Sequence, residues 1–226
     1  MVEYLDIVMN NNLESQLTTF FEKHKLVKYK KGEIIYRSGD IFNHIAFAKS
    51  GYIKLYIINS EGQQVTLNLF KPLFFLTMTY ATNNLESRYY FEAVTDVEAY
   101  RAPKEDVLKF LDNNPEILFE INHTLLKTLE ETIFNMGNIT LGNSYRKIAT
   151  IILSLSKQFG EESGHQIRIN FSTTHEVLAS LTGLTRETAG IQINKLKDEG
   201  IIDQEGKFII IKDLEQLKKI SSLDTY

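Results

Sequence analysis

The chain has 226 residues, of which 43% are hydrophobic and 24% charged, a composition typical of globular proteins with one or two domains. It contains no cysteine, which excludes disulfide bonds, cysteine-ligated iron–sulfur clusters and thiol redox switches. The net charge of −4 argues against a strongly basic nucleic-acid binder, but acidic and basic side chains nearly balance from Asn143 onward. No signal-peptide pattern occurs, and no apolar run approaches the roughly 18 residues of a membrane-spanning helix, so we expect a cytoplasmic protein without membrane contact.

The amino-terminal half predicts a small β-rich domain. A helix is expected over residues 13–24, after which glycines recur inside polar clusters typical of turns. Between these glycines the segments are short and rich in β-branched and aromatic residues, and turns about 8–12 residues apart are typical of a barrel or sandwich. We expect strands at residues 33–36, 45–48, 52–58, 64–70, 89–94 and 97–101, followed by a short helix at 104–111.

Beyond Pro115 the apolar spacing changes from that of strands to that of a helix. Side chains recur in steps of three and four residues, the heptad seam of a coiled coil, which favours pairing of this helix with its copy in a second subunit. A helix buried within one subunit is the alternative. The seam comprises Phe119, Asn122, Leu126, Leu129, Ile133, Met136 and Thr140. The stripe expected to pack on the β-rich domain comprises Leu118, Ile121, Leu125 and Thr132.

Residues 171–197 have the pattern of two short helices that meet at a glycine. Thr174 and Thr185 are each placed to cap a helix with a hydroxyl group, and Gly183 between them permits a sharp turn. Apolar residues recur at helical spacing along the inner side of both helices. The pattern predicts a helix-turn-helix over residues 174–197, a motif that places its second helix in the major groove of DNA.

The segments that flank this motif predict a winged helix. A helix is expected over residues 144–159, and two apolar strands around a tight turn at Gly206 predict the hairpin that forms the wing. A small helix is expected at 213–220. The expected domains are a β-domain at 1–114, a dimerisation helix and hinge at 115–142, and a DNA-binding domain at 143–226.

Two sets of residues occur in an order found in one known family. The helix-turn-helix contains the string Leu-Thr-Gly-Leu-Thr-Arg-Glu-Thr at 181–188, and the β-rich half contains, in order, Lys31-Gly-Glu, Ser38-Gly-Asp, Ser50-Gly and Glu61-Gly. Together they resemble the CRP/FNR family of bacterial transcription regulators. The resemblance implies an α+β fold: a β-roll (cupin-like, of the cyclic-nucleotide-binding-domain type), a long dimerisation helix and a C-terminal winged helix-turn-helix. It also implies a homodimer that binds palindromic promoter DNA and, if it is an activator, RNA polymerase.

The resemblance implies a set of DNA-contacting residues. Arg186 and Glu187 fall in the first turn of the second helix, and would bind a guanine edge and a cytosine amino group respectively. Thr174 and Thr185 would contact phosphates at the starts of their helices. His175 either contacts a phosphate or is solvated. The full set is Thr174, His175, Thr185, Arg186, Glu187, Gly190 and Lys195.

The second helix departs from the family pattern at one place. The family commonly has an arginine followed by an apolar residue, whereas this chain has Ile191 followed by Gln192. A cationic DNA contact is therefore missing. Lys195 or Lys197 is expected to supply replacement charge, and the alternative is that both are ordinary solvated lysines.

The residues expected to bind a cyclic nucleotide depart from the family as well. Its cyclic-nucleotide sensors hold the ligand phosphate with glycine and glutamate residues and with an Arg-Ser pair. Here residues 70–80 contain neither glycine nor an acidic residue, and Ser87 stands where that arginine belongs. Arg88 follows one residue late, which in a strand directs it to the opposite face. Thr132 and Ile133 also replace the Thr-Ser pair that contacts the base, so we expect no cyclic nucleotide.

Residues 70–91 instead contain a cluster of apolar and aromatic side chains. The cluster either fills the core of the domain or lines a pocket for a hydrophobic or aromatic effector. A filled core would give a regulator that is constitutively active or switched by another protein, as in PrfA-like relatives. Haem is not expected, because His44 and His123 are candidate ligands by residue type alone. The candidate pocket residues are Phe70, Phe74, Met78, Arg88, Tyr90, Leu129 and Thr132.

The sequence contains no catalytic or metal-binding constellation with recognisable spacing, so we expect neither an enzyme nor a metal site. Two functions stay open. The first is a transcription regulator whose β-domain controls the alignment of two recognition helices. The alternative is an effector-binding module of the same fold in which DNA binding is weak or lost.

Overall fold

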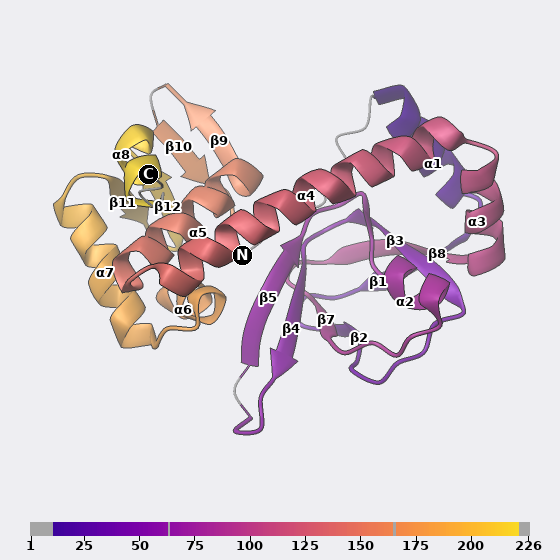
Figure 1. Ribbon diagram of the computed structural model, residues 1–226, viewed down its shortest axis with the longest axis horizontal. Helices are drawn as coiled ribbons and strands as arrows, with labels where there is room; N and C mark the ends of the chain where they lie inside the picture. The colour runs from indigo at the N-terminus through magenta and orange to yellow at the C-terminus, as the bar shows by residue number, and fades with distance from the viewer. Residues whose placement is uncertain (1–10, 63, 165, 222–226) are drawn as a thin grey trace. The chain divides into compact units, whose positions relative to one another are not determined.

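The computed structural model describes residues 11–62, 64–164 and 166–221, and divides the chain into two compact units (Figure 1). One unit ends at Thr128 and the other begins at Leu129, so the boundary falls inside helix α4 (Pro115–Leu141). The domain boundaries expected from the sequence, after residues 114 and 142, instead lie close to the two ends of this helix. Each unit buries its own set of apolar side chains.

The first unit contains two four-stranded antiparallel sheets, and its architecture confirms the predicted β-roll. Its strands are β1 (Lys25–Tyr29), β2 (Ile34–Tyr36), β3 (His44–Ser50), β4 (Ile53–Ile58), β5 (Gln64–Phe70), β6 (Phe74–Phe75), β7 (Tyr90–Ala93) and β8 (Val97–Pro103). One sheet has the order β1-β8-β3-β6 and the other the order β2-β7-β4-β5. Aromatic and β-branched side chains such as Phe47, Ile53 and Phe91 are buried in a shared core, which is why these short segments form strands.

Gly51 connects β3 to β4 in a conformation that glycine adopts readily. Its φ is 84°, and a Cβ at this position would lie 2.2 Å from the carbonyl oxygen of Asp96. We expect Gly51→Ala to lower the free energy of unfolding by about 3 kcal/mol. Alanine at this position would be strained by the positive φ and would also clash with the Asp96 carbonyl. Gly62→Ala is the matched control: its φ is 80° but the space around it is open, so it should cost about 1 kcal/mol. Urea unfolding measures both losses, and equal losses would contradict the steric explanation.

Helices close the first unit. Helices α1 (Asn11–Phe21), α2 (Met78–Asn83) and α3 (Lys104–Asp112) contribute apolar side chains to the same core, where the ring of Phe21 stacks on that of Phe47 with centroids 4.6 Å apart. The sequence predicts the first and third of these helices but not α2. No helix in the described part of the chain is both long enough and apolar enough to cross a membrane.

The first half of α4 packs one face against this unit. Its buried side chains are Ile117, Ile121, Thr124 and Thr128, whose spacing of four, three and four residues defines one helical face. The predicted packing stripe is confirmed at Ile121 and wrong at Leu118 and Leu125. Leu118 and Leu125 are 41% and 47% exposed, because they lie beside the predicted seam and away from the buried face. Thr132, the last member of that stripe, lies beyond the boundary between the units.

The second unit is a winged helix. After the end of α4 it consists of α5 (Ser144–Phe159), β9 (Gly160–Ser163), β10 (Gln166–Ile169), α6 (His175–Thr182), α7 (Arg186–Asp198), β11 (Ile202–Glu205), β12 (Phe208–Ile211) and α8 (Leu214–Ser221). The four strands form one antiparallel sheet in the order β11-β12-β10-β9. Ile152, Leu178 and Ile193 are fully buried and join α5, α6 and α7 in one core. The predicted wing is confirmed as β11 and β12, whereas the sequence does not predict β9 and β10.

Candidate nucleic-acid interface

Local capping builds both helices of the predicted motif. The Thr174 hydroxyl accepts a hydrogen bond from the Val177 N–H at 3.3 Å and caps α6. The Thr185 hydroxyl accepts one from the Thr188 N–H at 3.1 Å and caps α7. Gly183 ends α6 with a φ of 66°, a left-handed conformation suited to the turn. The helix-turn-helix predicted from these residues is therefore formed.

The inner face of α7 fixes the helix on its scaffold. Ala189, Ile193 and Leu196 are buried, as their helical spacing predicts. Gly190 is buried as well, and a Cβ at this position would lie 3.0 Å from Nδ1 of His175. The His175 ring therefore lies against Gly190. Gly190 was expected in the DNA-contacting set, but its place in the structure is different: it makes room for this ring and offers little surface of its own.

The first turn of α7 presents two charged side chains to solvent. Arg186 and Glu187 are both exposed, and neither forms an ion pair with another residue that the structure describes. The guanidinium keeps its donor fork free, and the carboxylate keeps its acceptor oxygens free. These are the groups that bind the edges of guanine and cytosine.

A pocket of about 340 Å³ lies beside Arg186. It is lined by Thr174, His175, Glu176, Arg186, Gln204, Gly206 and Lys207, which come from the starts of α6 and α7 and from the wing. The wing is held against the start of α6, because the backbone N–H and the hydroxyl of Thr173 both donate to the Lys207 carbonyl, at 2.8 and 3.1 Å. With two cationic side chains against one carboxylate, the pocket is suited to an anion. Sequence reasoning missed Gln204 and Lys207, although the predicted turn at Gly206 marked the wing that carries them.

Lys195 contacts two other side chains of the second unit. Its Nζ lies 4.3 Å from the centre of the Tyr145 ring and 3.9 Å from the Glu199 carboxylate. The Tyr145 hydroxyl donates to that same carboxylate. Burial, together with this hydrogen bond, raises the pKa of Tyr145 above its usual value. Lys195 thus joins α7 to α5, and a phosphate contact by its ammonium would compete with Glu199.

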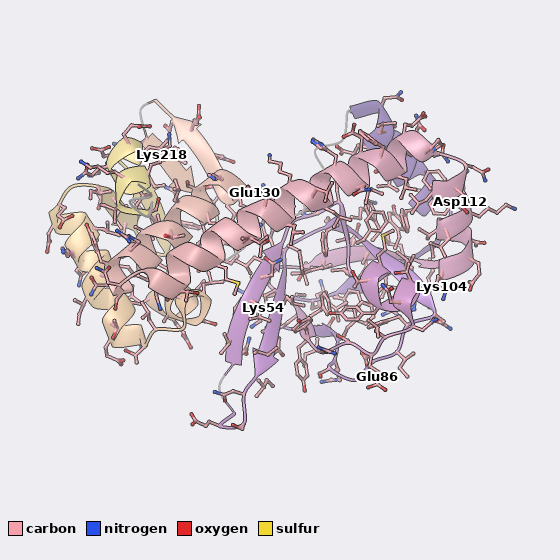
Figure 2. The ribbon with its side chains drawn as sticks, viewed as in Figure 1. Lys54, Glu86, Lys104, Asp112, Glu130 and Lys218 are labelled. Carbon is pink, nitrogen blue, oxygen red and sulfur yellow. The ribbon has the colours of Figure 1, made fainter. Side chains whose placement is uncertain are left out.

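The predicted seam lies along the solvent-facing side of α4. Phe119, Leu126, Leu129, Ile133 and Met136 are between 55% and 69% exposed, and Asn122 is exposed as well. Figure 2 shows the side chains of this helix, with Glu130 labelled midway along it. Large apolar side chains gathered in one exposed stripe are typical of a surface that binds another protein.

The structure places the predicted effector residues in different surroundings. The rings of Phe70 and Phe74 stack with centroids 3.9 Å apart inside the core of the first unit. Tyr90 stacks on Tyr56 at 5.1 Å. Met78 is partly buried and packs against the same core. Leu129 is 55% exposed on α4, where Thr132 is partly exposed. Apart from Arg88, the members of this set in the first unit pack in the core or stack on another ring.

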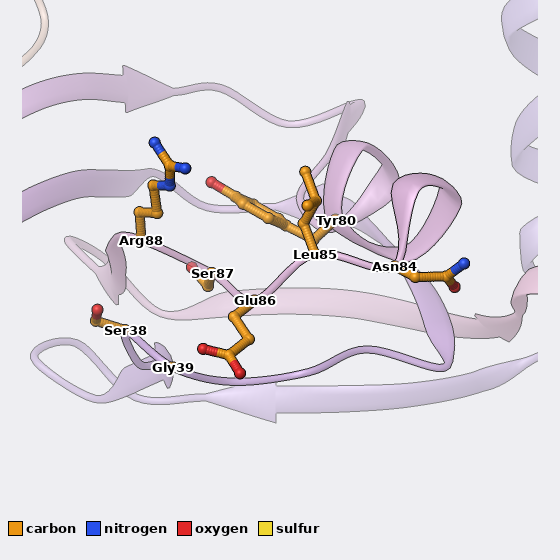
Figure 3. Close-up of a pocket in the computed structure, with 8 residues that line it drawn as sticks. All are labelled: Ser38, Gly39, Tyr80, Asn84, Leu85, Glu86, Ser87 and Arg88. Atoms are coloured by element: carbon orange, nitrogen blue, oxygen red, sulfur yellow. The ribbon is translucent and has the colours of Figure 1, made fainter.

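Arg88 lines an open pocket of about 590 Å³ in the first unit (Figure 3). The pocket residues are Ser38, Gly39, Tyr80, Asn84, Leu85, Glu86, Ser87 and Arg88. Figure 3 shows the Tyr80 ring extending toward the Arg88 side chain, and burial raises the pKa of Tyr80 above its usual value. Ser87 is buried, and its hydroxyl donates to the Tyr89 carbonyl at 2.8 Å. The hydroxyl of Ser87 is therefore hydrogen-bonded within the chain. Arg88 precedes β7 and lines the same pocket as Ser87, so the expectation that a strand directs Arg88 to the opposite face is wrong.

The two candidate haem ligands lie in different surroundings. The Nε2 atom of His44 is hydrogen-bonded to the Tyr36 hydroxyl at 2.9 Å. Burial and the nearby Arg101 guanidinium lower the pKa of His44 below its usual value. His123 is exposed on α4. Among the described residues, no group of three or more His, Cys, Asp or Glu side chains is arranged to hold a metal ion.

The fold and the interface define a β-roll protein with a winged-helix DNA-binding domain. The family model of the cyclic nucleotide-binding domain matches residues 26–114, and that of the Crp-like helix-turn-helix domain matches residues 146–220. The chain belongs to the CRP/FNR family and is a CRP-like transcriptional regulator with a helix-turn-helix DNA-binding domain.

Relatives of known function are similar over most of their length. The chain is 22% identical to the CRP-like cAMP-activated global transcriptional regulator of Mycobacterium tuberculosis, over 85% of this chain and 86% of that protein. It is 24% identical to the global nitrogen regulator of a Nostoc species, over 81% and 83% respectively. A transcriptional regulator of the CRP/FNR family from Thermus thermophilus has a TM-score of 0.70 at 26% identity, covering 87% of this chain and 98% of that one. These relatives are transcriptional regulators and not enzymes.

Proposed function

We propose that the protein is a dimeric, sequence-specific regulator that binds promoter DNA through residues 174–197. The observation that carries the proposal is the free, exposed pair Arg186 and Glu187 at the start of α7, beside a pocket shared with α6 and the wing. In the major groove, the Arg186 fork would bind guanine and the Glu187 carboxylate would accept from a cytosine amino group.

Phosphates of the DNA backbone would position this reading pair. The starts of α6 and α7 each offer backbone N–H groups that the threonine caps leave free, and the helix dipoles favour an anion there. His175 and Lys207 line the pocket between the two helix starts and the wing. Contacts of this kind fix the register of a protein on DNA without reading its sequence.

Pairing of two α4 helices is supported by the exposed apolar stripe that follows the heptad spacing. Two recognition helices held about 34 Å apart would contact successive major grooves on one side of the duplex. The operator would then be an inverted repeat. Selection of bound duplexes from a random pool tests this, and a chain that enriches no sequence would instead support the effector-binding module with weak or lost DNA binding.

Lys207 provides a test of the phosphate contacts. We expect Lys207→Ala to weaken binding to the selected operator and to unrelated DNA by a similar factor, because a phosphate contact carries no sequence information. The slope of log K against log salt should become shallower by about 2 for a dimer, since about 0.9 counterion is released per contact. Lys212→Ala is the matched control, because Lys212 forms an ion pair with Asp203 at 2.7 Å and does not line the pocket. Titration by fluorescence anisotropy at several salt concentrations measures both slopes, and unchanged values for Lys207→Ala would exclude a phosphate contact by Lys207.

We further propose that the β-roll controls this activity through a signal other than a cyclic nucleotide. Support comes from buried aromatic packing at Phe70 and Phe74, and from Ser87, whose hydroxyl is bonded within the chain. Ser87 offers no charge to a cyclic phosphate, and Arg88 is the one cationic side chain among the residues that line the pocket around Ser87. A hydrophobic or aromatic effector, or a regulator without an effector, is consistent with this packing. If the protein is an activator, it would also contact RNA polymerase.

A further inference from the structure

Ile191 is an unusual residue on the surface of the second unit. It is 63% exposed, and it is the only exposed large hydrophobic side chain among the described residues from Ser144 to Ser221. The other apolar side chains of α7, such as Ile193 and Leu196, are fully buried. The one large apolar side chain that the described residues from Ser144 to Ser221 leave exposed therefore lies on the helix proposed to enter the major groove.

The position of Ile191 places it on the same face of α7 as Glu187. It follows Glu187 by four residues, and Asn194 follows it by three, so the three side chains form one exposed row. This row points away from the face that packs on the scaffold. Along the helix axis Ile191 lies about 6 Å beyond Glu187, roughly the rise of two base pairs.

The side chain of isoleucine has no hydrogen-bonding group. It can therefore form a hydrogen bond neither with a phosphate nor with the polar edge of a base. The thymine C5-methyl is the apolar group that the major groove presents, and apolar side chains contact it. Docking α7 in the groove removes water from both surfaces. We propose that Ile191 reads a thymine methyl group about two base pairs from the pair read by Glu187. The inference rests on the proposed function and adds a specificity to it.

The experiment removes one methyl at a time from the DNA. The full chain first selects its operator from a random duplex pool, and each thymine of that operator is then replaced singly by deoxyuridine. At one position in each half-site, the replacement should weaken wild-type binding about fourfold, and about fifteenfold when both half-sites are changed, as expected for burial of one carbon group per contact. Ile191→Ala should lose this sensitivity at that position alone.

Two variants make the result specific. Ile191→Val keeps branched methyl groups and should keep the sensitivity, and Asn194→Ala changes the neighbouring side chain of the same row and should keep it too. Circular dichroism melting should be the same for all variants, because the changed side chains are exposed. If an operator is selected but no uridine position distinguishes Ile191→Ala from wild type, this inference is wrong and the proposed function stands. If no sequence is selected, both are wrong.

Discussion

Replacing Arg186 with alanine is expected to remove most of the distinction between the operator and unrelated DNA. The Arg186 side chain is exposed and free of ion pairs within the described residues, so its removal leaves the fold unchanged. A bidentate arginine–guanine pair contributes about 1–3 kcal/mol of discrimination, so the loss of two pairs per dimer should weaken operator binding by about 30- to 10⁴-fold. Fluorescence anisotropy with the selected operator, at physiological salt, measures this loss.

Arg186→Lys separates charge from geometry. Lysine keeps the positive charge but not the planar fork, so this variant should bind unrelated DNA as wild type does and lose most of the operator preference. Glu187→Gln should instead change the preferred base at one position of each half-site. Unchanged operator affinity in Arg186→Ala would mean that this helix does not read bases through Arg186.

The elements that the sequence predicts best are those specified by their own residues. The helix-turn-helix follows from the two threonine caps and from the left-handed Gly183, which act within a few residues of the backbone they fix. The wing follows in the same way from the turn at Gly206, where φ is 60°. Local hydrogen bonds and backbone conformations of this kind are visible in a short window of sequence.

The sequence does not predict the features that depend on distant partners. Strand β1 has mostly exposed or half-buried side chains and is a strand because it pairs with β8. The two-residue strand β6 likewise exists through its pairing with β3. Strand β9 is exposed throughout and is paired with β10. None of these segments has the alternating hydrophobicity by which a strand is recognised.

Two parts of the candidate interface also depend on tertiary contacts. The space that Gly190 leaves for His175 joins α7 to α6, and no local pattern distinguishes this glycine from one that contacts DNA. Lys207 reaches the interface because its carbonyl accepts two hydrogen bonds from Thr173.

On α4, the heptad spacing correctly indicates an apolar stripe. The opposite, buried face includes Thr124 and Thr128, which a search for apolar residues does not find.

Leu126→Glu is expected to separate the proposed dimer and to weaken operator binding with it. Leu126 is 61% exposed in the single chain, so the substitution should leave the fold of each subunit intact. Within a paired seam it would remove two buried leucines, which contribute about 1.5–3 kcal/mol each, so the dimer dissociation constant should rise by about 10²- to 10⁴-fold. Sedimentation equilibrium measures this constant.

The matched control is Lys127→Glu, which alters charge at the next residue of α4, outside the predicted seam. It should leave both the dimer and operator binding largely unchanged, whereas Leu126→Glu should retain only the weak binding of one recognition helix to a half-site. Because each α7 offers few cationic groups and one reading pair, its affinity alone is low and depends on a second helix held in register. A dimer that survives Leu126→Glu would place the subunit interface elsewhere, and a wild-type chain that is monomeric at micromolar concentration would contradict the dimer proposal itself.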